Sequence, residues 1–151
     1  MTTVAWDGEI LAADGRITCG TVIECDNYNK IFKLHDISYY GDTLKYLGIA
    51  GSVNHVQAIL HNLHIECFVD NDDEARHAIC GIIVGTKSVY ILEEETLYLS
   101  QFDRKTKLAV GSGGECAKSA MALGLDAKQA VKHAMKFDVC TGGRIRSARS
   151  K

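Results

Sequence analysis

The dipeptide Asp7-Gly8 lies between two short apolar runs near the start of the 151-residue chain. This arrangement is a strong signal for a β-hairpin with a two-residue turn, because Asp-Gly accepts the positive φ angles that a type I′ turn requires. Counting back from such a turn pairs Thr2 with Ala13. The hairpin therefore predicts that Asp14 lies beside Thr2, at the end of the ribbon away from the turn.

Turn residues, capping residues and hydrophobic spacing predict the other elements. A helix is expected over 53–63 after Ser52, and two more over 116–123 and 127–137. Strands are expected over residues 2–6, 9–13, 18–23, 30–37, 46–50, 80–84, 88–92, 96–100 and 107–110, with a last strand near the carboxyl end. We find neither repeats nor a linker. This order predicts one α+β domain over residues 1–151, in which helices cover both faces of a largely antiparallel sheet system.

Composition excludes several classes of function. Apolar residues make up 46 % of the chain, which excludes a disordered protein, and the net charge of −2 gives no general attraction for nucleic acid or anionic membranes. The amino-terminal residues lack the features of a signal peptide, and no apolar run reaches membrane-spanning length. We therefore expect a cytoplasmic protein that binds neither nucleic acid nor a membrane. The basic residues of 144–151 are interpreted as a solvated tail.

Neither a metal site nor a cofactor is expected. The six cysteines have no CxxC spacing and are interpreted as reduced thiols, and His55, His61 and His64 lack partner ligands at metal-binding spacing. The segment GSGG at 111–114 could cradle a phosphate at the start of a helix. It lacks the lysine and the Ser/Thr that end a Walker motif, which favours a structural turn.

Five segments carry a more specific signal: TTVAWDGEILAADGRIT at the start, then NKIFKL, GIAGS, AVGSGG and DVCTGG. Each is weak alone, but in this order over residues 2–143 they resemble the proteasome β-subunits and the bacterial HslV-type peptidases. The resemblance implies a four-layer αββα sandwich of the N-terminal-nucleophile hydrolase class, in a compact form such as a phage would carry. It also implies a threonine peptidase that forms a homo-oligomeric ring, acts on peptides or unfolded proteins, and works with an ATP-dependent unfoldase.

In such an enzyme Thr2 becomes the nucleophile once Met1 is removed. A threonine hydroxyl needs a base within hydrogen-bond reach. The new α-amine of Thr2 suits this task, because its pKa is about 7.7–8.0 and it belongs to the same residue. By resemblance, Lys30 is the lysine whose charge favours the neutral amine, and Asp14 is its carboxylate partner. Lys33, in the same segment, is the alternative lysine.

The resemblance assigns four further residues to the reaction. Gly51 matches the glycine whose backbone N–H forms the oxyanion hole and stabilises the developing negative oxygen. Ser112 matches the serine that hydrogen-bonds the amine. Asp138 and Thr141 match the pair that completes the same network.

The resemblance also assigns the substrate contacts. The backbone at Thr18 and Val53 would clamp an extended substrate as an added strand. Ile17, Lys33 and Ile49 would shape the pocket for the side chain before the scissile bond. Ile49 there implies a moderate preference for apolar side chains.

Two other functions fit the same segments. One is an amidase that uses the same nucleophile on a small molecule. The other is a non-catalytic subunit or decoy, which keeps the fold and joins or blocks another ring. Retention of Met1 would favour the second, because Thr2 would then have no free amine.

Overall fold

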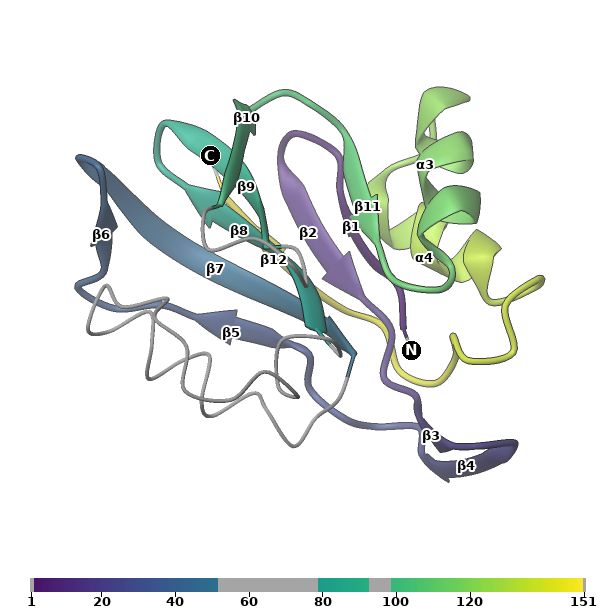
Figure 1. Ribbon diagram of the computed structural model, residues 1–151. Helices are drawn as coiled ribbons and strands as arrows, with labels where there is room; N and C mark the ends of the chain where they lie inside the picture. The colour runs from purple at the N-terminus through teal and green to yellow at the C-terminus, as the bar shows by residue number, and fades with distance from the viewer. Residues whose placement is uncertain (1, 52–78, 93–98, 151) are drawn as a thin grey trace.

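The computed structural model describes residues 2–51, 79–92 and 99–150, and its strands form two large sheets and one small one (Figure 1). A four-stranded antiparallel sheet has the order β11-β1-β2-β12. Its strands are β1 (Val4–Trp6), β2 (Ile10–Ala13), β11 (Leu108–Val110) and β12 (Arg146–Arg149). This sheet lies between the second large sheet and a pair of helices.

The second sheet has six strands, in the order β10-β9-β8-β7-β5 with β6 paired to β7. Its strands are β5 (Ile31–Lys33), β6 (Ser38–Tyr39), β7 (Asp42–Gly51), β8 (Ile79–Gly85), β9 (Ser88–Leu92) and β10 (Ser100–Asp103). Strand β7 begins earlier than the expected 46–50. The carboxylate of Asp42 accepts hydrogen bonds from the N–H groups of Lys87 at 2.9 Å and Ser88 at 3.0 Å, which fixes this end of β7 to the β8–β9 turn.

A small hairpin, β3 (Ile17–Cys19) with β4 (Val22–Cys25), projects from the body of the molecule (Figure 1). The sequence predicted one strand over 18–23. The chain instead turns back at Gly20-Thr21, so that the two short strands pair with each other. Strand β4 is largely exposed, with Val22 at 62 % and Ile23 at 49 %.

Two helices, α3 (Gly114–Ala122) and α4 (Ala127–Ala134), cover the outer face of the four-stranded sheet. Asp126 begins α4 with a reciprocal capping box, in which its side chain accepts from the Gln129 N–H and the Gln129 side chain accepts from the Asp126 N–H. Alanines dominate the contact, and their small side chains let the helices approach the sheet closely. The fully buried alanines are Ala5, Ala12, Ala117, Ala127, Ala130 and Ala134.

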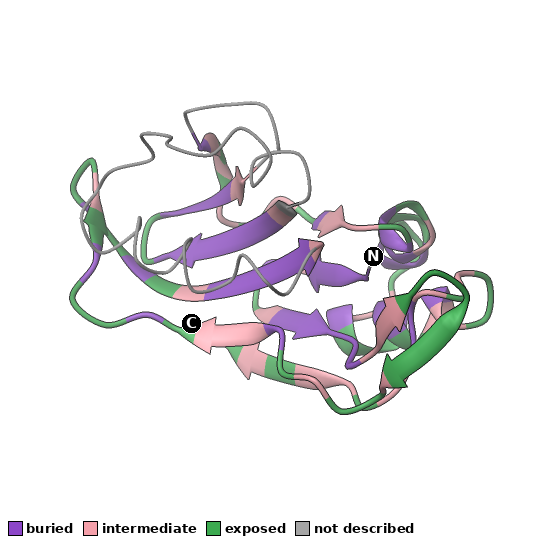
Figure 2. Cartoon of the chain, turned by 60° about the horizontal axis from the view of Figure 1, so that its bottom comes forward, coloured by how far each residue is buried: buried purple, intermediate pink, exposed green. Residues whose placement is uncertain are grey.

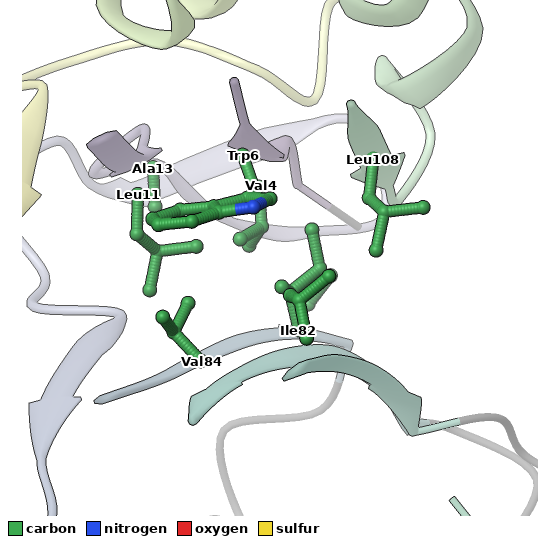
Figure 3. Close-up of a cluster of buried hydrophobic side chains, with 9 residues drawn as sticks. Val4, Trp6, Leu11, Ala13, Ile82, Val84 and Leu108 are labelled. Carbon is green, nitrogen blue, oxygen red and sulfur yellow. The ribbon is translucent and has the colours of Figure 1, made fainter. Parts of the chain in front are cut away.

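The main core fills the space between the two large sheets. Trp6 is fully buried there, and its indole N–H donates to the carbonyl of Arg104 at 2.9 Å. Figure 3 shows Trp6 and its apolar neighbours from both sheets. These neighbours include Val4, Leu11, Ala13, Ile82, Val84 and Leu108. Burying one of the valine, leucine or isoleucine side chains of this set stabilises the fold by about 1.5–3 kcal/mol.

A second set of buried side chains lies on the other face of the six-stranded sheet, where residues alternate along β7 and β8. Leu47, Ile49 and Ile83 belong to this set, whereas Ala50 and Ile82 face the main core. The helix pair and the two large sheets thus pack as three layers (Figure 1), and Figure 2 shows buried residues running through the strands of both large sheets. The helix expected over 53–63 lies outside the described residues. No described helix has the length and apolarity that a membrane crossing requires.

The register of the first hairpin differs from the predicted one by two residues. Trp6 pairs with Leu11, and the N–H of Asp7 donates to the carbonyl of Ile10 at 3.2 Å. The central turn residues are therefore Gly8, with φ +102°, and its successor. The cause is the Asp7 side chain, which accepts hydrogen bonds from the next two N–H groups beyond Gly8. The predicted pairing of Thr2 with Ala13 is wrong.

The carboxyl-terminal residues do not form the expected solvated tail. Strand β12 pairs along its whole length with β2. Arg146 donates to the Tyr28 carbonyl at 3.1 Å, and Arg149 forms an ion pair with Glu9 at 2.7 Å. The basic side chains therefore serve as partners for loop carbonyls and for one carboxylate.

Candidate active site

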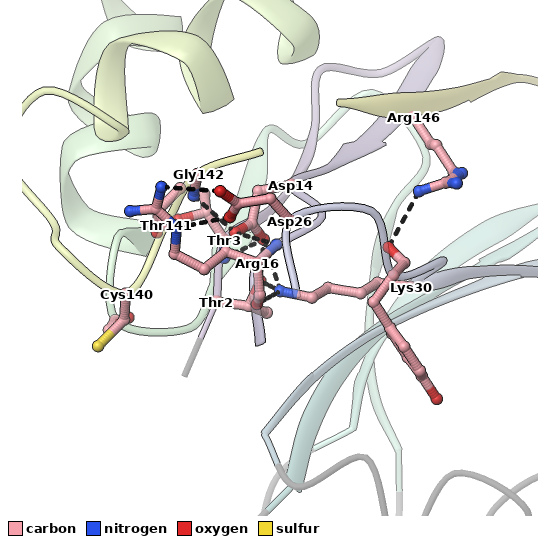
Figure 4. A network of polar contacts seen from close by, with 12 residues as sticks. Thr2, Thr3, Asp14, Arg16, Asp26, Lys30, Cys140, Thr141, Gly142 and Arg146 are labelled. Atoms are coloured by element: carbon pink, nitrogen blue, oxygen red, sulfur yellow. Dashed lines mark hydrogen bonds and ion pairs between the residues drawn. The ribbon is translucent and has the colours of Figure 1, made fainter. Parts of the chain in front are cut away.

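Thr2 lies two residues before β1 and is buried, with 2 % of its surface exposed. Its hydroxyl donates to Oδ1 of Asp14 and accepts a hydrogen bond from Nζ of Lys30 (Figure 4). The hairpin thus brings Asp14 beside Thr2 even with its shifted register, because the N–H of Asp14 donates to the carbonyl of Thr3 at 3.3 Å. The nucleophile candidate lies directly between a carboxylate and an ammonium group.

Asp14, just beyond the end of β2, is almost fully buried and hydrogen-bonded on both oxygens. Oδ1 accepts from Lys30 Nζ at 2.9 Å and from the Thr3 N–H at 3.2 Å. Oδ2 accepts from the N–H groups of Gly142 at 2.9 Å and Arg16 at 3.3 Å. A buried carboxylate is tolerated when it is paired and saturated in this way.

Lys30 precedes β5 and has only 4 % of its surface exposed. Besides Asp14, its Nζ donates to the carbonyl of Arg16 at 2.6 Å. Burial lowers the pKa of Lys30 below its usual value, and the nearby carboxylate of Asp14 opposes that shift. Lys33, the alternative lysine, is exposed on β5. The structure therefore places Lys30, and not Lys33, next to Thr2.

A second polar cluster surrounds Asp138, in the loop after α4. Ser112 and Thr141 each donate to its Oδ2 at 2.6 Å, and the Cys140 N–H donates to Oδ1 at 3.1 Å. Burial alone would raise the pKa of Asp138, but these hydrogen bonds outweigh it and leave the pKa below its usual value. Asp138 is thus an ionised carboxylate at neutral pH.

The two clusters meet at the first residues of the chain. Gly111, with φ +95°, lies against Thr2 so closely that a Cβ there would overlap the Thr2 carbonyl oxygen. Ser112, which is bonded to Asp138, directly follows this contact in the chain. Thr3 makes the second link, because its hydroxyl lies 2.7 Å from that of Thr141.

Gly51, predicted to supply the oxyanion-hole N–H, is the last residue of β7. The end of β7 lies near Thr2 through Gly111, which contacts both. A Cβ placed on Gly111 would overlap the Thr2 carbonyl oxygen and would lie 3.3 Å from the Cβ of Ala50, the residue before Gly51. The sheet also ties Lys30 to this strand, through a 3.0 Å hydrogen bond from the Ile49 N–H to the Lys30 carbonyl. Lys30, just before β5, and Gly51, at the end of β7, thus lie on neighbouring paired strands of one sheet.

The predicted substrate residues lie in different surroundings. Ile17 and Thr18 are half-buried on β3, which pairs with β4 alone among the described strands. Ile49 is 4 % exposed and packs in the outer hydrophobic cluster of the six-stranded sheet. Val53 lies outside the described residues.

A hollow of about 370 Å³ opens between the β3–β4 hairpin and the loop after α4. Thr18 and Ile23 line one side, and Phe137, Asp138 and Cys140 line the other. The hollow therefore joins the predicted substrate strand to the Asp138 cluster.

Motif-based reasoning missed several groups that hold the site together. Arg16 forms a 2.8 Å ion pair with Asp26 and donates to the Val139 carbonyl at 3.1 Å, which joins three loops. This pairing raises the pKa of Arg16 and lowers that of Asp26. Gly142 and Thr3 were also missed, because they act through backbone N–H groups and through a contact across 138 positions. The paired threonines at the start of the chain were the available signal for Thr3.

Within residues 2–51, 79–92 and 99–150, no three His, Cys, Asp or Glu side chains are grouped so that they could hold a metal ion. His55, His61 and His64 lie outside these ranges.

Comparison with known proteins identifies the fold. No family model matches the chain, and no curated protein matches it by sequence. Solved structures do match. HslV from Trypanosoma brucei has 19 % identity and a TM-score of 0.67, over 98 % of this chain and 97 % of its own. Thiobacillus denitrificans BPH in complex with epoxomicin has 19 % identity and a TM-score of 0.72, over 99 % and 98 %.

A second structure of Thiobacillus denitrificans BPH matches with 20 % identity and a TM-score of 0.71, over 99 % of this chain and 97 % of its own. Because these likenesses extend over nearly the whole of both chains, they show that this chain has the HslV-type fold. The expected resemblance is confirmed at that level.

Proposed function

We propose that this protein is a threonine-type endopeptidase whose nucleophile is the Thr2 hydroxyl, exposed as the amino-terminal residue once Met1 is removed. One observation carries the proposal. The Thr2 hydroxyl is held between the ammonium of Lys30 and the carboxylate of Asp14, in a buried and fully hydrogen-bonded site. A threonine that only began a strand would need neither partner.

The reaction follows from these groups. The Thr2 amine takes the hydroxyl proton as Oγ1 attacks the carbonyl carbon of a peptide bond, and the Gly51 N–H stabilises the resulting oxyanion. The C–N bond breaks, the leaving amine takes the proton, and an ester to Thr2 remains. Water then loses a proton to the Thr2 amine as it attacks the ester. The carboxyl product leaves, and Oγ1 regains its proton.

The electrostatics of the site support this assignment of base and nucleophile. Lys30 is a buried cation next to Thr2, and a neighbouring positive charge disfavours the ammonium form of the Thr2 amine. More of the amine is then neutral at neutral pH and able to accept a proton. Ser112 and Thr141, both bonded to Asp138, complete the proposed network on the other side.

The comparisons support the wider proposal. One of the BPH structures with this fold is a complex with epoxomicin. We extend the proposal to a single four-layer domain that assembles as a homo-oligomeric ring in the cytoplasm and receives unfolded protein from an ATP-dependent unfoldase. The edge of β3 that pairs with no other described strand suits an extended peptide at Thr18, with Ile17, Lys33, Ile49 and Val53 as further substrate contacts.

The decisive experiment is intact-mass analysis of the purified protein before and after incubation with epoxomicin. We expect loss of the Met1 mass, followed by one covalent adduct that peptide mapping assigns to Thr2. Thr2→Ala is the matched control and should form no adduct. A protein that has lost Met1 and still gives neither adduct nor peptide cleavage would overturn the proposal.

A second candidate, a non-catalytic subunit of the same fold, is favoured by the burial of Thr2. A nucleophile must be reached by its substrate, and only 2 % of Thr2 is exposed. The same measurement separates the two functions, because retention of Met1 in the purified protein would favour the non-catalytic one.

A further inference from the structure

We infer that Thr3 is a positioning residue for the Thr2 nucleophile, acting through a one-directional chain of hydrogen bonds from its hydroxyl through Thr141 to Asp138. The inference rests on the proposed function of Thr2 and extends it to a residue that the motifs leave without a role. Thr3 is fully buried, and both of its donors are used. Its N–H donates to Asp14 at 3.2 Å, and its hydroxyl contacts that of Thr141 at 2.7 Å.

The direction of the chain follows from counting protons. An ionised Asp138 can only accept hydrogen bonds, so Ser112 and Thr141 each donate their one hydroxyl proton to Oδ2 at 2.6 Å. Thr141 then has no proton left for Thr3. The Thr3 hydroxyl is therefore the donor in the 2.7 Å contact. Each donation polarises the next hydroxyl, which strengthens its hydrogen bond to the carboxylate.

The fold reserves space for this contact at Gly113. A Cβ at residue 113 would overlap the Thr3 hydroxyl oxygen and lie 2.9 Å from Oγ1 of Thr141. The backbone of Gly113, with φ −92°, does not itself require glycine. The close approach of the two hydroxyls therefore explains the absence of a side chain there.

Residue 3 thus connects two carboxylates that belong to different parts of the fold. Asp14 follows β2, and Asp138 lies in the loop after α4. Asp14 accepts the N–H of the peptide between Thr2 and Thr3. Asp138 holds the Thr3 side chain indirectly, through the hydroxyl of Thr141. Since that peptide leads directly to Thr2, its orientation sets the direction in which the Thr2 amine and hydroxyl point.

The charged groups around Thr2 predict how loss of the Thr3 hydroxyl would act. They are Asp14 from the segment after β2, Lys30 from the segment before β5 and Asp138 from the loop after α4. Without the Thr3 donor, Thr141 becomes a weaker donor to Asp138, and more negative charge stays on that carboxylate. The ammonium form of the Thr2 amine is then favoured, so its pKa should rise and less of the base should be available at neutral pH.

The test compares Thr3→Val, which removes the hydroxyl at nearly constant volume, with Thr3→Ser, which keeps it. Both are made in the chain that begins at Thr2. Thr43→Val, at an exposed position of β7, is the matched control. Two quantities are measured by mass spectrometry across pH: the rate at which epoxomicin modifies Thr2, and the acylation of the Thr2 amine by acetic anhydride, which gives the pKa of that amine.

We expect Thr3→Val to slow modification about ten- to a hundred-fold, because a misplaced nucleophile loses much of its proximity advantage. The pKa of its Thr2 amine should rise, and the loss of rate at low pH should begin at a higher pH. Thr3→Ser should restore most of the rate and the original pKa. Thr43→Val should match the unmodified chain in both measurements.

Equal rates and equal amine pKa values for Thr3→Val and the unmodified chain would overturn the inference while leaving the proposed function intact. If the unmodified chain does not react with epoxomicin, the amine titration still decides. A pKa that rises in Thr3→Val and returns in Thr3→Ser would support the role of Thr3, whereas an unchanged pKa would overturn it. Equal losses of rate in Thr3→Val and Thr3→Ser would also overturn it, because the hydroxyl would then not matter.

Discussion

Two buried aspartates lie at strand ends in this molecule, and they differ in their hydrogen-bond and ion-pair partners. Asp14, beyond the end of β2, and Asp42, at the start of β7, are 1 % and 3 % exposed. Both accept hydrogen bonds from backbone N–H groups. Asp14 also faces the ammonium of Lys30 and the hydroxyl of Thr2, whereas the third partner of Asp42 is the neutral phenol of Tyr90 at 2.8 Å.

The comparison separates Asp14, to which we assign a role in the proposed reaction, from Asp42, which serves the architecture of the fold. Asp42 joins β7 to the β8–β9 turn and needs only neutral donors. Asp14 holds a buried cation beside the hydroxyl of Thr2, which costs desolvation and gives the fold no obvious advantage over an apolar pair. Burial of a carboxylate alone is therefore no sign of function. The charged partner and the adjacent hydroxyl are the informative features.

The largest predicted effect is on the reactivity of Thr2 and follows from removing Lys30, the ion-pair partner of Asp14. Lys30→Met should slow epoxomicin modification of Thr2 by about 10²–10⁴-fold, because the cation that favours the neutral amine in the proposed mechanism is lost. Lys45→Met, an exposed lysine of β7, is the control and should react normally. Circular dichroism must show that the Lys30 variant is folded. If the Lys30→Met variant is folded and Thr2 is modified by epoxomicin at the normal rate, the proposed difference in role between Asp14 and Asp42 would be contradicted.

The next effect follows from replacing Asp42, and it should appear in the stability of the fold and not in the reactivity of Thr2. Asp42→Ala leaves two backbone N–H groups and the Tyr90 hydroxyl without their partner, so the free energy of unfolding should fall by about 3 kcal/mol. Urea denaturation measures this loss. The rate of epoxomicin modification under native conditions should stay unchanged. A variant of normal stability and reduced rate would reverse the two assignments.

The smallest effect concerns Tyr90, whose pKa burial and the hydrogen bond to Asp42 raise to about 12. A raised pKa means that the folded state keeps its proton longer than the unfolded state. The stabilising contribution is therefore complete below about pH 10, the usual tyrosine pKa, and is lost as pH rises toward 12. Tyr90→Phe should lose about 1 kcal/mol at neutral pH and show a shallower decline of unfolding free energy above pH 10. Parallel alkaline declines in the two proteins would contradict this.

The neighbourhood of Thr2 and Asp14 could be predicted from one local turn signal, because a hairpin brings its two far ends together whatever its exact register. The register of the hairpin could not be predicted in the same way, because the Asp7 side chain selects the turn through its own hydrogen bonds to the next N–H groups. The two helices after residue 113 were also predictable, from the Asp126 cap and the apolar spacing. These features depend on residues close together in the chain.

The rest depends on contacts between distant residues. Strand β7 extends back to Asp42 because the Asp42 carboxylate accepts hydrogen bonds from the N–H groups of Lys87 and Ser88, contacts across 45 and 46 positions that no local pattern predicts. The link from Thr3 to Thr141 likewise appears only when the chain is folded. Five ordered segments indicated the HslV-type fold, but they did not indicate which backbone groups saturate Asp14.

The pairing of β12 with β2 has a practical consequence for anyone who shortens this chain. Residues 146–149 occupy the outer side of β2, directly opposite the stretch that leads into Asp14. Deleting them would turn β2 into an edge strand with unpaired amides and carbonyls, a surface that invites strand exchange between molecules. A trimmed version should therefore show self-association together with disorder at Thr2, the proposed nucleophile, although the cut lies more than a hundred positions away.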